Sequence, residues 1–478
     1  MRYSYSFAQV RAADALEIEK GTPASVLMQR AGEALASHAS RVLKERAVGE
    51  VLFVCGGGNN GRDGFVAARI LMERGVDAAV LCPSEKFSEE CARAKAKFRG
   101  EVFGRMPRRF YPVVVDCILG TGISRAPEGS AEDLIHFVNS SGAYVIACDL
   151  PSGLSENGIA LGACVRADET VCMGALKNAL LMADGADLAG RVSVAEIGIH
   201  AEGGAEIWEN GDVKALFPPR KSHSNKGNYG TAAIVGGTAG VGAAFLAAGA
   251  CLKSGCGYTK LFLPQEIYPL AIGKLNACIL REFHKIDEEI IKADVVALGM
   301  GFGSGKPIYE YIALLLRRYE GVLVLDADAL TSLGAFGVDI LKKKTCKIVM
   351  TPHPKEFARL VQKPLDEVLQ NAVALAESFA VEYGVTVAFK NNRTVITDGA
   401  RTAINLTGSP ALAKGGSGDV LAGFLAGTCA RGVPLFEGAL AASYLLGRAG
   451  ELVSEALGEY SPDATEIIGY LPQAIKTL

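Results

Sequence analysis

The chain has 478 residues, of which 49% are hydrophobic and 21% charged. This is the composition of an ordinary globular protein with room for two or three domains, and it excludes extended disorder. The formal net charge of -3 gives no electrostatic footprint for nucleic acid or an anionic membrane, so the sequence predicts small-molecule chemistry with neither partner.

Residues 1–21 contain no apolar segment of the signal-peptide kind, and no uninterrupted apolar run reaches about 18 residues, so neither secretion nor a membrane span is expected. The 12 cysteines are scattered through strand-like runs without a C-x-x-C pair. This spacing argues against a zinc site or a disulfide framework and favours buried, reduced thiols. A cytoplasmic location is therefore expected.

Two helical patterns open the chain, the second beginning near "TPASVLMQRAG" at residue 22. Short β-rich runs then alternate with helical patterns, which is typical of a parallel sheet. The expected strand runs are "VLFVC" (51–55), "DAAVLC" (77–82), "PVVVDCILG" (112–120), "YVIACD" (144–149) and "ETVCMG" (169–174). They predict an α/β domain over residues 1–212, with the three-layer sandwich of a Rossmann-like fold.

The stretch "WENGDVKALFPPRKSHSNKGNYG", residues 208–230, interrupts this alternation with two prolines and polar turn residues. A second αβ series follows, so that residues 213–478 are predicted to form another open α/β domain. Its expected strands are "TAAIVGG", "TKLFLP", "VVALGMG", "VLVLDADAL", "KIVMTPHP", "TVAFKNN" and "TVITDG", followed by helices after "GGSGD". In such sheets ligands bind beyond the carboxyl ends of the strands, so the residues there are the candidates for function.

The first candidate is the glycine loop in "FVCGGGNNGRDGF", in which Gly56, Gly58 and Gly61 satisfy G-x-G-x-x-G. In a chain with 56 glycines that match alone is weak evidence for a dinucleotide site. The carboxylate that would hold a ribose about twenty residues later is missing, because the chain there reads "VLCPSE". Asp63 near the helix start would also repel a pyrophosphate, so the loop is not a simple phosphate cradle.

Further carboxylates follow two strand runs, Asp116 before "ILGTG" and Asp149 before "LPSG". A single aspartate at a strand end is more often a turn or helix-cap residue, but three polar strand ends beside glycines favour a site. Oxygen groups such as those of Asn60, Asp116 and Ser152 suit a hard cation rather than zinc or copper. Asp149, which ends a strand at this site, is a candidate for acid or base chemistry.

The segments "LMQRAG", "GGGNNGRDG", "DCILGTG" and "DLPSG", in this order and spacing, resemble the NAD(P)H-hydrate epimerase domain family over residues 1–212. The resemblance implies that the Asn-Asn-Gly and Gly-Thr-Gly segments bind a hydrated nicotinamide nucleotide, with potassium between them and Asp149 beside the reacting ring. The usual family pattern has glycine where Arg62 stands. The implied substrate-binding residues are Asn59, Asn60, Gly61, Arg62, Asp63, Gly120, Thr121, Gly122, Ile123, Ser124, Arg125, Ala126 and Asp149, and the implied potassium ligands are Asn60, Asp116 and Ser152.

Near the C-terminus, "SPALAKGGSGDVLAGFLAG" places Gly415, Gly416 and Gly418 before an apolar helix. Their backbone N–H groups, at the positive end of the helix dipole, would form an anion site. Asp419, where the helix begins, is placed to take a proton from a hydroxyl while phosphoryl charge develops nearby. The alternative is a glycine-rich turn with Asp419 as the helix cap.

This motif resembles the ribokinase-like superfamily. The segments "GNYGTAAIVGG", "GAAFLAAGACLKSGCG", "LGMGFGSG", "LDADAL", "TPHPKE" and "FKNNRT" narrow the resemblance to the NAD(P)H-hydrate dehydratase family over residues 220–470. By position, the resemblance implies substrate-binding residues Ala243, Gly301, Gly303, His353 and Asp419. It implies ADP-binding residues Lys390, Asn391, Asn392, Arg393, Thr394, Gly415, Gly416, Ser417 and Gly418.

Together the resemblances imply a two-step repair of NADHX and NADPHX, the hydrates of NADH and NADPH. The first domain would interconvert the R and S hydrates, and the second would phosphorylate the hydroxyl of the S form with ADP, using Asp419 as the base, and then expel phosphate. Magnesium is expected to bridge the nucleotide phosphates, potassium to bind the first domain, and the chain to form a homo-oligomer. The alternative is a ribokinase-like kinase of a small alcohol or vitamin precursor, fused to a non-catalytic nucleotide-binding module like the related domain of an mRNA-decapping scaffold.

Overall fold

The computed structural model describes residues 2–283 and 288–478, and the chain divides into two compact units. The first unit is Tyr3–Ala205, and the second is Glu206–Leu478 together with Arg2. The sequence places the break near residue 212. The residues on both sides of that point belong to the second unit, because Trp208 and Val213 are buried in its core.

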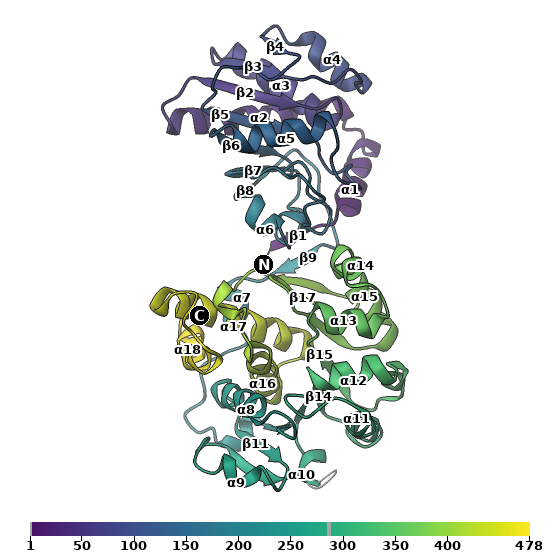
Figure 1. Ribbon diagram of the computed structural model, residues 1–478, viewed down its shortest axis with the longest axis vertical. Coiled ribbons are helices and arrows are strands. Elements are labelled where there is room, and N and C mark those ends of the chain that lie inside the picture. Colours follow the sequence, from purple (N-terminus) through teal and green to yellow (C-terminus); the bar gives the residue numbers. More distant parts are fainter. Residues whose placement is uncertain (1, 284–287) are drawn as a thin grey trace. The chain divides into compact units, whose positions relative to one another are not determined.

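The first unit contains a seven-stranded sheet in the order β4-β3-β2-β5-β6-β7-β8 (Figure 1), in which all neighbouring strands are parallel. Its strands are β2 (Glu50–Cys55), β3 (Asp77–Leu81), β4 (Val102–Phe103), β5 (Val113–Cys117), β6 (Tyr144–Cys148), β7 (Glu169–Met173) and β8 (Arg191–Ala195). Its helices are α1 (Phe7–Glu19), α2 (Ala24–Glu45), α3 (Asn59–Glu73), α4 (Glu89–Lys97), α5 (Ser130–Ser140) and α6 (Gly185–Leu188), with a 3-10 turn at Asn178–Leu180.

Helices cover both faces of this sheet. On one face, buried residues of α2, α3 and α4 pack with residues such as Val51, Phe53 and Val115. On the other face, α5 packs with residues such as Leu52 and Val114. Every residue of β5 is buried, as expected for a parallel strand covered on both sides. The three-layer α/β sandwich expected from the sequence is confirmed.

Helix α3 lies unusually close to the sheet. A Cβ atom on Gly64 would lie 2.6 Å from the Cys55 Sγ atom and 2.9 Å from the Cys117 Sγ atom. Cys55 and Cys117 are paired in register on β2 and β5, and both are fully buried. Glycine on the helix and small thiols on the strands therefore let the first turn of α3 reach the carboxyl ends of the strands.

The second unit contains the other sheet, in the order β1-β9-β18-β17-β16-β15-β14-β13-β10-β11-β12. Its strands are β1 (Arg2–Ser4), β9 (Ala205–Ile207), β10 (Thr231–Val235), β11 (Tyr258–Leu263), β12 (Ile279–Glu282), β13 (Val295–Leu298), β14 (Val322–Leu325), β15 (Lys347–Met350), β16 (Thr386–Phe389), β17 (Thr394–Thr397) and β18 (Thr402–Asn405). The strands from β12 to β16 in this order pair in parallel, and β17 is antiparallel to both of its neighbours.

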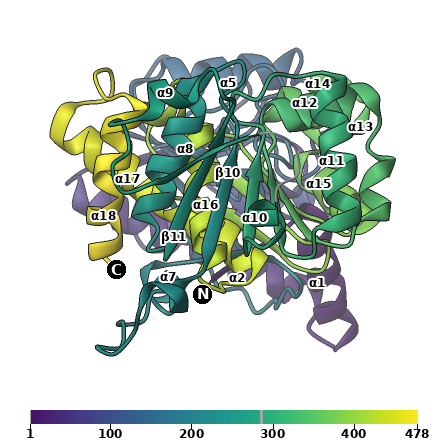
Figure 2. The same cartoon turned by 90° about the horizontal axis from the view of Figure 1, so that it is seen from below.

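The helices of this unit are α7 (Asn210–Lys214), α8 (Val241–Lys253), α9 (Tyr268–Ala271), α10 (Glu288–Ile291), α11 (Lys306–Arg318), α12 (Asp328–Phe336), α13 (Pro354–Val361), α14 (Leu365–Gln370), α15 (Ala372–Tyr383), α16 (Ser417–Ala430), α17 (Leu435–Leu457) and α18 (Ala464–Lys476), with 3-10 turns at Lys226–Tyr229, Asp339–Lys343 and Pro410–Leu412. Figure 2 shows α8, α17 and α18 on one side of the central strands and α11, α12, α13 and α15 on the other. Buried residues of α16 share a core with those of α8, α17 and α18. All residues of α16 from Val420 to Ala430 are buried, which explains why this helix is apolar on every side.

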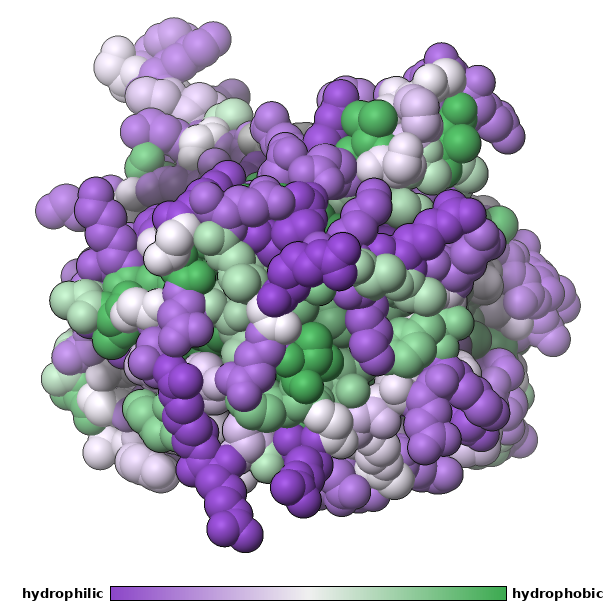
Figure 3. Space-filling view, turned by 90° about the horizontal axis from the view of Figure 1, so that it is seen from above, coloured by the Kyte–Doolittle hydropathy of each residue, from purple (hydrophilic) through white to green (hydrophobic). Residues whose placement is uncertain are grey.

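The surface has the mixed character of an ordinary globular protein. On the face shown in Figure 3, hydrophobic residues are interspersed with hydrophilic ones, a normal arrangement for exposed apolar side chains. None of the helices in the described part of the chain combines the length and apolar character that a membrane crossing needs.

Candidate functional site

The strand order of the first unit changes direction between β2 and β5. From β2 the chain proceeds through β3 to β4 on one side, and from β5 it proceeds through β6, β7 and β8 on the other. Such a switch point leaves a crevice at the carboxyl ends of the two central strands, which is the usual ligand site of an open α/β sheet. The glycines after β2 and Asp116 on β5 both lie there.

A cavity of about 330 Å³ lies at this position. It brings together seven of the residues predicted from sequence, namely Asn59, Asn60, Arg62, Asp63, Gly120, Thr121 and Asp149. Apolar side chains of Val10, Leu27, Met28, Met173, Ile197 and Ile199 also line it. A polar floor with apolar walls is the ordinary composition of a small-molecule pocket.

The residues predicted to bind substrate do not all line this cavity. Asn59–Asp63 form the first turns of α3, which Gly58 caps, rather than the preceding loop. Gly61 packs against the Gly56 carbonyl, where a Cβ atom would come within 1.9 Å of the oxygen. Residues 122–126 follow Thr121 in an irregular, largely exposed segment beyond the cavity lining.

An ion pair lies at the floor of the cavity. The Lys177 Nζ atom donates a hydrogen bond of 2.6 Å to Asp149 Oδ1, and the Met173 backbone N–H donates one of 2.9 Å to the same oxygen. Asp149 has a φ of 68°, an uncommon value for a residue other than glycine and one that is found often at functional sites. Sequence reasoning missed Lys177, which has no motif of its own after "ETVCMG".

A second carboxylate, Asp63, lines the same cavity. Burial raises the pKa of Asp63 to about 6, and the charge of Asp149 also raises it, whereas Arg62 lowers it. The Arg62 guanidinium donates two hydrogen bonds of 2.9 and 2.7 Å to Asp63 Oδ1. The arginine that replaces the family's usual glycine is therefore placed against this carboxylate.

The three residues predicted to bind potassium lie together beside the cavity, where Asn60 is part of the lining and Asp116 and Ser152 are not. Asp116 accepts hydrogen bonds from the Ser152 hydroxyl at 2.6 Å and from the Ser152 N–H at 2.8 Å. Asn60 Nδ2 donates to the Leu119 carbonyl at 2.8 Å, which also accepts from the Ser152 hydroxyl at 3.0 Å. Asp116 is fully buried, and burial raises its pKa to about 6.

The second unit has its own switch point, between β10 and β13. The glycine loops after these strands cross closely, because Ala239 and Gly240 both donate backbone hydrogen bonds to the Gly301 carbonyl. A Cβ atom on Gly301 would lie 2.0 Å from the Gly240 carbonyl oxygen, and its φ is 62°, so this crossing requires glycine. Gly303 donates its N–H to Asp328 Oδ2 at 2.8 Å, and Ala243 lies in the first turn of α8.

Four charged residues meet beside this switch point. Lys390 Nζ donates a hydrogen bond of 2.8 Å to Asp326 Oδ1. Burial raises the pKa of Asp419 to about 6, with the Asp326 charge raising it further and Lys390 lowering it. Burial, together with Asp326, also raises the pKa of Glu356 to about 7. The sequence reasoning assigned Asp419 and Lys390 but missed Asp326 and Glu356, although "LDADAL" and "TPHPKE" contain them.

The residues predicted to bind ADP lie on two segments at the same end of the sheet. Lys390–Arg393 occupy the turn between β16 and β17, and Thr394 begins β17. Gly415 and Gly416 precede α16, and Ser417, Gly418 and Asp419 form its first turn. The Ser417 Oγ atom is buried and has no hydrogen-bond partner among the described residues. A Cβ atom on Gly418 would lie 3.2 Å from Lys390 Nζ, which connects the two segments.

His353 has a structural role in this arrangement. It caps α13, and its Nδ1 atom accepts hydrogen bonds from the N–H groups of Lys355 and Glu356. The Nε2 atom lies 3.5 Å from Glu356 Oε1. The histidine is thus fixed by the helix cap, and its second nitrogen faces the carboxylate of Glu356.

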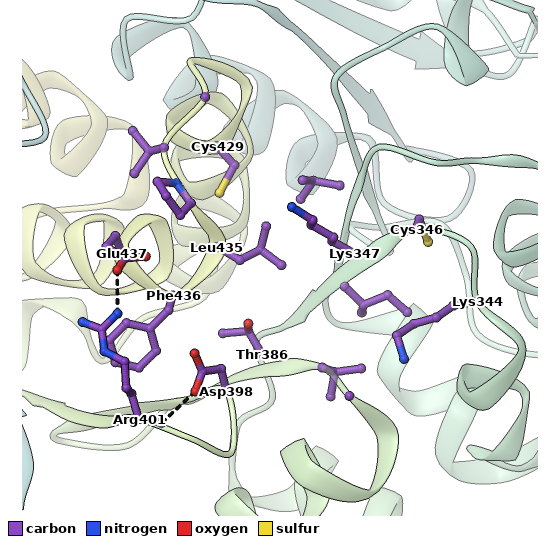
Figure 4. Close-up of a pocket in the computed structure, with 17 residues that line it drawn as sticks. Lys344, Cys346, Lys347, Thr386, Asp398, Arg401, Cys429, Leu435, Phe436 and Glu437 are labelled. Carbon is purple, nitrogen blue, oxygen red and sulfur yellow. Dashed lines mark hydrogen bonds and ion pairs between the residues drawn. The ribbon is translucent and has the colours of Figure 1, made fainter. Parts of the chain in front are cut away.

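A larger cavity of about 660 Å³ opens at the other end of this sheet (Figure 4). Val322, Lys347 and Thr386 line it, and they are the first residues of β14, β15 and β16. Arg401 on its wall is already paired with Glu437 and Glu206. This cavity contains none of the residues predicted from sequence, and it lies at the amino ends of the strands rather than at the switch point.

Comparison with known proteins gives a match for each unit. Residues 232–473 match the family model described as NAD(P)H-hydrate dehydratase, and residues 24–179 match the YjeF-related protein N-terminus. The bifunctional NAD(P)H-hydrate repair enzyme Nnr of Moorella thermoacetica is 31% identical over 95% of this chain and 93% of its own length. The corresponding enzyme of Thermofilum pendens is 32% identical over 98% of this chain and 96% of its own.

Among solved structures, the ADP/ATP-dependent NAD(P)H-hydrate dehydratase of Bacillus subtilis, co-crystallised with ATP and Mg²⁺, is similar with a TM-score of 0.52 and 28% identity. The match covers 57% of this chain and 98% of that one. Another similar structure is a ribokinase-like superfamily protein of Enterococcus faecalis, with a TM-score of 0.50 and 26% identity over 59% of this chain and 98% of that one. The ribokinase-like fold expected from sequence is confirmed.

Proposed function

The chain belongs to the bifunctional NAD(P)H-hydrate repair enzyme family, which combines an epimerase with a dehydratase, and from this premise we propose how its own residues divide the work. The first unit, Tyr3–Ala205, epimerises NADHX and NADPHX at the cavity between β2 and β5. The second unit, which includes Glu206–Leu478, dehydrates the S epimer at the switch point between β10 and β13. The observation that supports this division is that each switch point has its own cluster of carboxylates and a lysine.

In the first domain Asp149 performs the proton transfers. The epimerised carbon carries a hydroxyl group and is bonded to the ring nitrogen. When Asp149 takes the hydroxyl proton, the C–O bond becomes a carbonyl and the C–N bond breaks, with its electron pair and the proton from Asp149 going to nitrogen. When the nitrogen attacks the other face of the carbonyl, the ring closes, the same proton transfers run in reverse, and the other epimer forms. The apolar walls of the cavity exclude water from the opened ring.

In the second domain Asp419 takes the proton of the substrate hydroxyl while the hydroxyl oxygen attacks the terminal phosphate of ADP, and AMP leaves as its bond to that phosphate breaks. The N–H groups at the start of α16 stabilise the negative charge that develops. Phosphate then leaves with the electron pair of the C–O bond, and the neighbouring ring carbon loses a proton to solvent, which restores the double bond. Phosphate is a far better leaving group than hydroxide, and this makes the elimination feasible. Asp419 is suited to this step because its pKa of about 6 lets it act as a base at neutral pH.

Magnesium fits the second site. Mg²⁺ usually binds one or two carboxylates together with the phosphates of a nucleotide, and Asp326 and Glu356 supply carboxylates beside the proposed nucleotide segments. When bound, the ion neutralises phosphate charge. We assign Lys390–Thr394 and Gly415–Gly418 to ADP, and Ala243, Gly301, Gly303 and His353 to the hydrated nucleotide.

Potassium fits the first site. The amide oxygen of Asn60 makes no hydrogen bond among the described residues, whereas its nitrogen is fixed to the Leu119 carbonyl. With the carboxylate of Asp116, the hydroxyl of Ser152 and the Leu119 carbonyl, this gives oxygen donors of the kind that a hard cation prefers. The ion would supply fixed positive charge behind the segment that holds the substrate.

The decisive experiment is to incubate the protein with hydrated NADH and ADP, and to follow the absorbance of reduced nicotinamide. Recovery of NADH with release of inorganic phosphate is the expected result, and recovery should extend to the R hydrate because the first domain converts it to the S form. Accumulation of a stable phosphorylated product would instead indicate the alternative, a kinase. If only the S hydrate is consumed and the R hydrate remains, the first domain would be a binding module without epimerase activity.

The compartment and the assembly are proposed separately. All twelve cysteines are free thiols, which fits a reducing compartment such as the cytoplasm. We also expect a homo-oligomer, to be checked by light scattering of the purified chain.

A further inference from the structure

Lys177 is the feature of the first unit that lacks an explanation. Its side chain is only 2% exposed, and it is among the largest fully buried side chains of the described chain. Burying an ammonium group is costly unless the charge is paired and hydrogen-bonded. Burial lowers the pKa of Lys177, but the charge of Asp149 and the contacts with Asp149 and Cys172 together raise it above its usual value, so the group remains an ammonium ion.

The surroundings of this ammonium fix its direction. Besides Asp149, it donates to the Met173 carbonyl at 3.0 Å, and it lies 3.5 Å from the Cys172 sulfur and from the Ala175 carbonyl. The backbone on each side of Lys177 is bonded to Tyr5, through Tyr5 N to the Leu176 carbonyl and through Asn178 N to the Tyr5 carbonyl. Lys177 therefore has little freedom to turn away from Asp149.

The same contacts orient Asp149. Lys177 and the Met173 N–H both donate to Oδ1, and Oδ2 forms no hydrogen bond among the described residues. The side chain is 18% exposed and lines the cavity together with Met173 and Lys177. One oxygen is thus held by the protein, while the other remains available to a ligand. A pair of packed apolar residues would stabilise the fold at lower cost, so stability alone does not account for this arrangement.

We propose that Lys177 is the positioning residue of epimerisation: it clamps Asp149 through Oδ1 and leaves Oδ2 as the oxygen that exchanges a proton with the substrate hydroxyl. This inference rests on the proposed function of the first domain. Asp149 remains the catalytic residue, and Lys177 acts through it. The role requires both a positive charge and the right length of side chain.

The test compares K177M, K177R, D149N and the double variant K177M/D149N in the full-length protein. Without the ammonium, Oδ1 of Asp149 loses the hydrogen bond from Lys177, and Oδ2 loses its fixed direction. K177M should therefore lose about 10²-fold in kcat for epimerisation while its KM changes less than about threefold. K177R should recover part of the loss. Lys44, exposed on α2, provides the matched control K44M, which should behave as the wild type.

The double variant separates a positioning role from a merely structural one. If Lys177 acts only through Asp149, K177M/D149N should be no slower than D149N, and dehydration of the S hydrate should be unchanged in all variants. Additive losses in the double variant, or a K177M protein with the wild-type kcat, would overturn the proposal.

A measurement without turnover distinguishes this proposal from the proposed function. Crystal structures of K177M and K177R supply it, because the Asp149 carboxylate should leave its wild-type position in K177M and keep it in K177R. If the wild type proves inactive as an epimerase but Asp149 moves only in K177M, the proposed function fails while the clamp stands. If Asp149 keeps its wild-type position in K177M, the clamp is wrong whatever the activity.

Discussion

Each unit places a lysine beside an aspartate at the carboxyl ends of its strands, but the two ion pairs differ in their relation to the proposed catalytic carboxylate. In the first unit Lys177 is bonded to Asp149 itself. In the second unit Lys390 is bonded to Asp326, and Asp419 stands nearby with a raised pKa. The comparison teaches that a lysine in a cleft can either hold the reacting carboxylate or balance the charge around a base that it does not clamp.

The largest effect should come from the clamped carboxylate. Asp149→Asn should slow epimerisation by about 10²- to 10⁴-fold, the usual contribution of a positioned acid or base. Chiral separation of the R and S hydrates over time measures the rate. Dehydration of the S hydrate is the internal control, and an equal loss of both activities would mean that the comparison of two independent sites is wrong.

The unclamped carboxylate should give the next largest effect. Asp419→Asn should reduce dehydration by about 10²-fold, because the base is lost while the N–H groups at the start of α16 remain. Calorimetry should find ADP affinity within a factor of about two of the wild type, and epimerisation should persist. Near-normal dehydration by this variant would remove Asp419 as the base.

The pH dependence of dehydration provides a sharper test of the same residue. A base must be deprotonated to act, and the pKa of Asp419 is raised to about 6. The rate should therefore fall as the pH drops through 6, by about tenfold between pH 7 and pH 5. Initial rates with saturating ADP give this profile. A flat profile over this range would contradict the assignment, and the residual activity of Asp419→Asn should not show the decline.

The contact between the two nucleotide segments predicts a smaller effect on binding. A Cβ atom on Gly418 would lie 3.2 Å from Lys390 Nζ and 3.6 Å from Asp326 Oδ2. Gly418→Val should therefore weaken ADP binding by about tenfold by obstructing the approach of phosphate to the backbone. Calorimetric titration gives the Kd. Gly469→Val, at a helix position with nothing within 4 Å, is the matched control, and similar Kd values for both variants would refute the contact.

The smallest effect concerns stability away from the sites. Burial, with help from Arg41 and Arg191, lowers the pKa of His38 to about 4, while its ring is bonded to the buried Glu169. His38 takes up a proton more readily in the unfolded chain than in the folded protein. The free energy of unfolding should therefore decrease as the pH falls from 6.5 towards 4, by about 2 kcal/mol between pH 7 and pH 5.

His38→Gln, which keeps a hydrogen-bond donor, should lack that contribution. Urea titration at each pH gives the free energy of unfolding of the wild type and of the variant. The difference between the two isolates the contribution of His38 from those of Asp63 and Asp116. The pKa values of these two carboxyls are raised by burial, so they favour the folded state on acidification. A difference that does not change with pH would contradict the prediction.

The sequence predicts the architecture of both units because the buried parallel strands read as short apolar runs between helical patterns. The strands that it leaves out are β1, β4, β8, β9, β12 and β18, which are two to five residues long. Partial exposure of β8 and β12 removes the apolar run that would reveal them. The position of both switch points follows from pairings that only the folded sheet shows.

The sites are predictable where a residue lies in its own motif and unpredictable where a long-range contact gives it a role. Asn60, Asp149 and Asp419 follow strands or begin helices, so the sequence indicates them. Lys177 meets Asp149 across 28 residues, and Lys390 meets Asp326 across 64. His353 presents a different difficulty. It lies in a motif that indicates it, but the same residue is both the cap of α13 and a proposed substrate ligand, and the motif does not separate these two roles.

The burial of the thiols gives each unit a chemical reporter of its opening. All seven cysteines of the first unit are buried, whereas in the second unit Cys256 and Cys278 are partly accessible. A small alkylating reagent should therefore label those two positions in the native protein and reach the first unit only when it unfolds locally or globally. Mass spectrometry of timed labelling would then record how often each half opens, without adding a dye or an engineered residue.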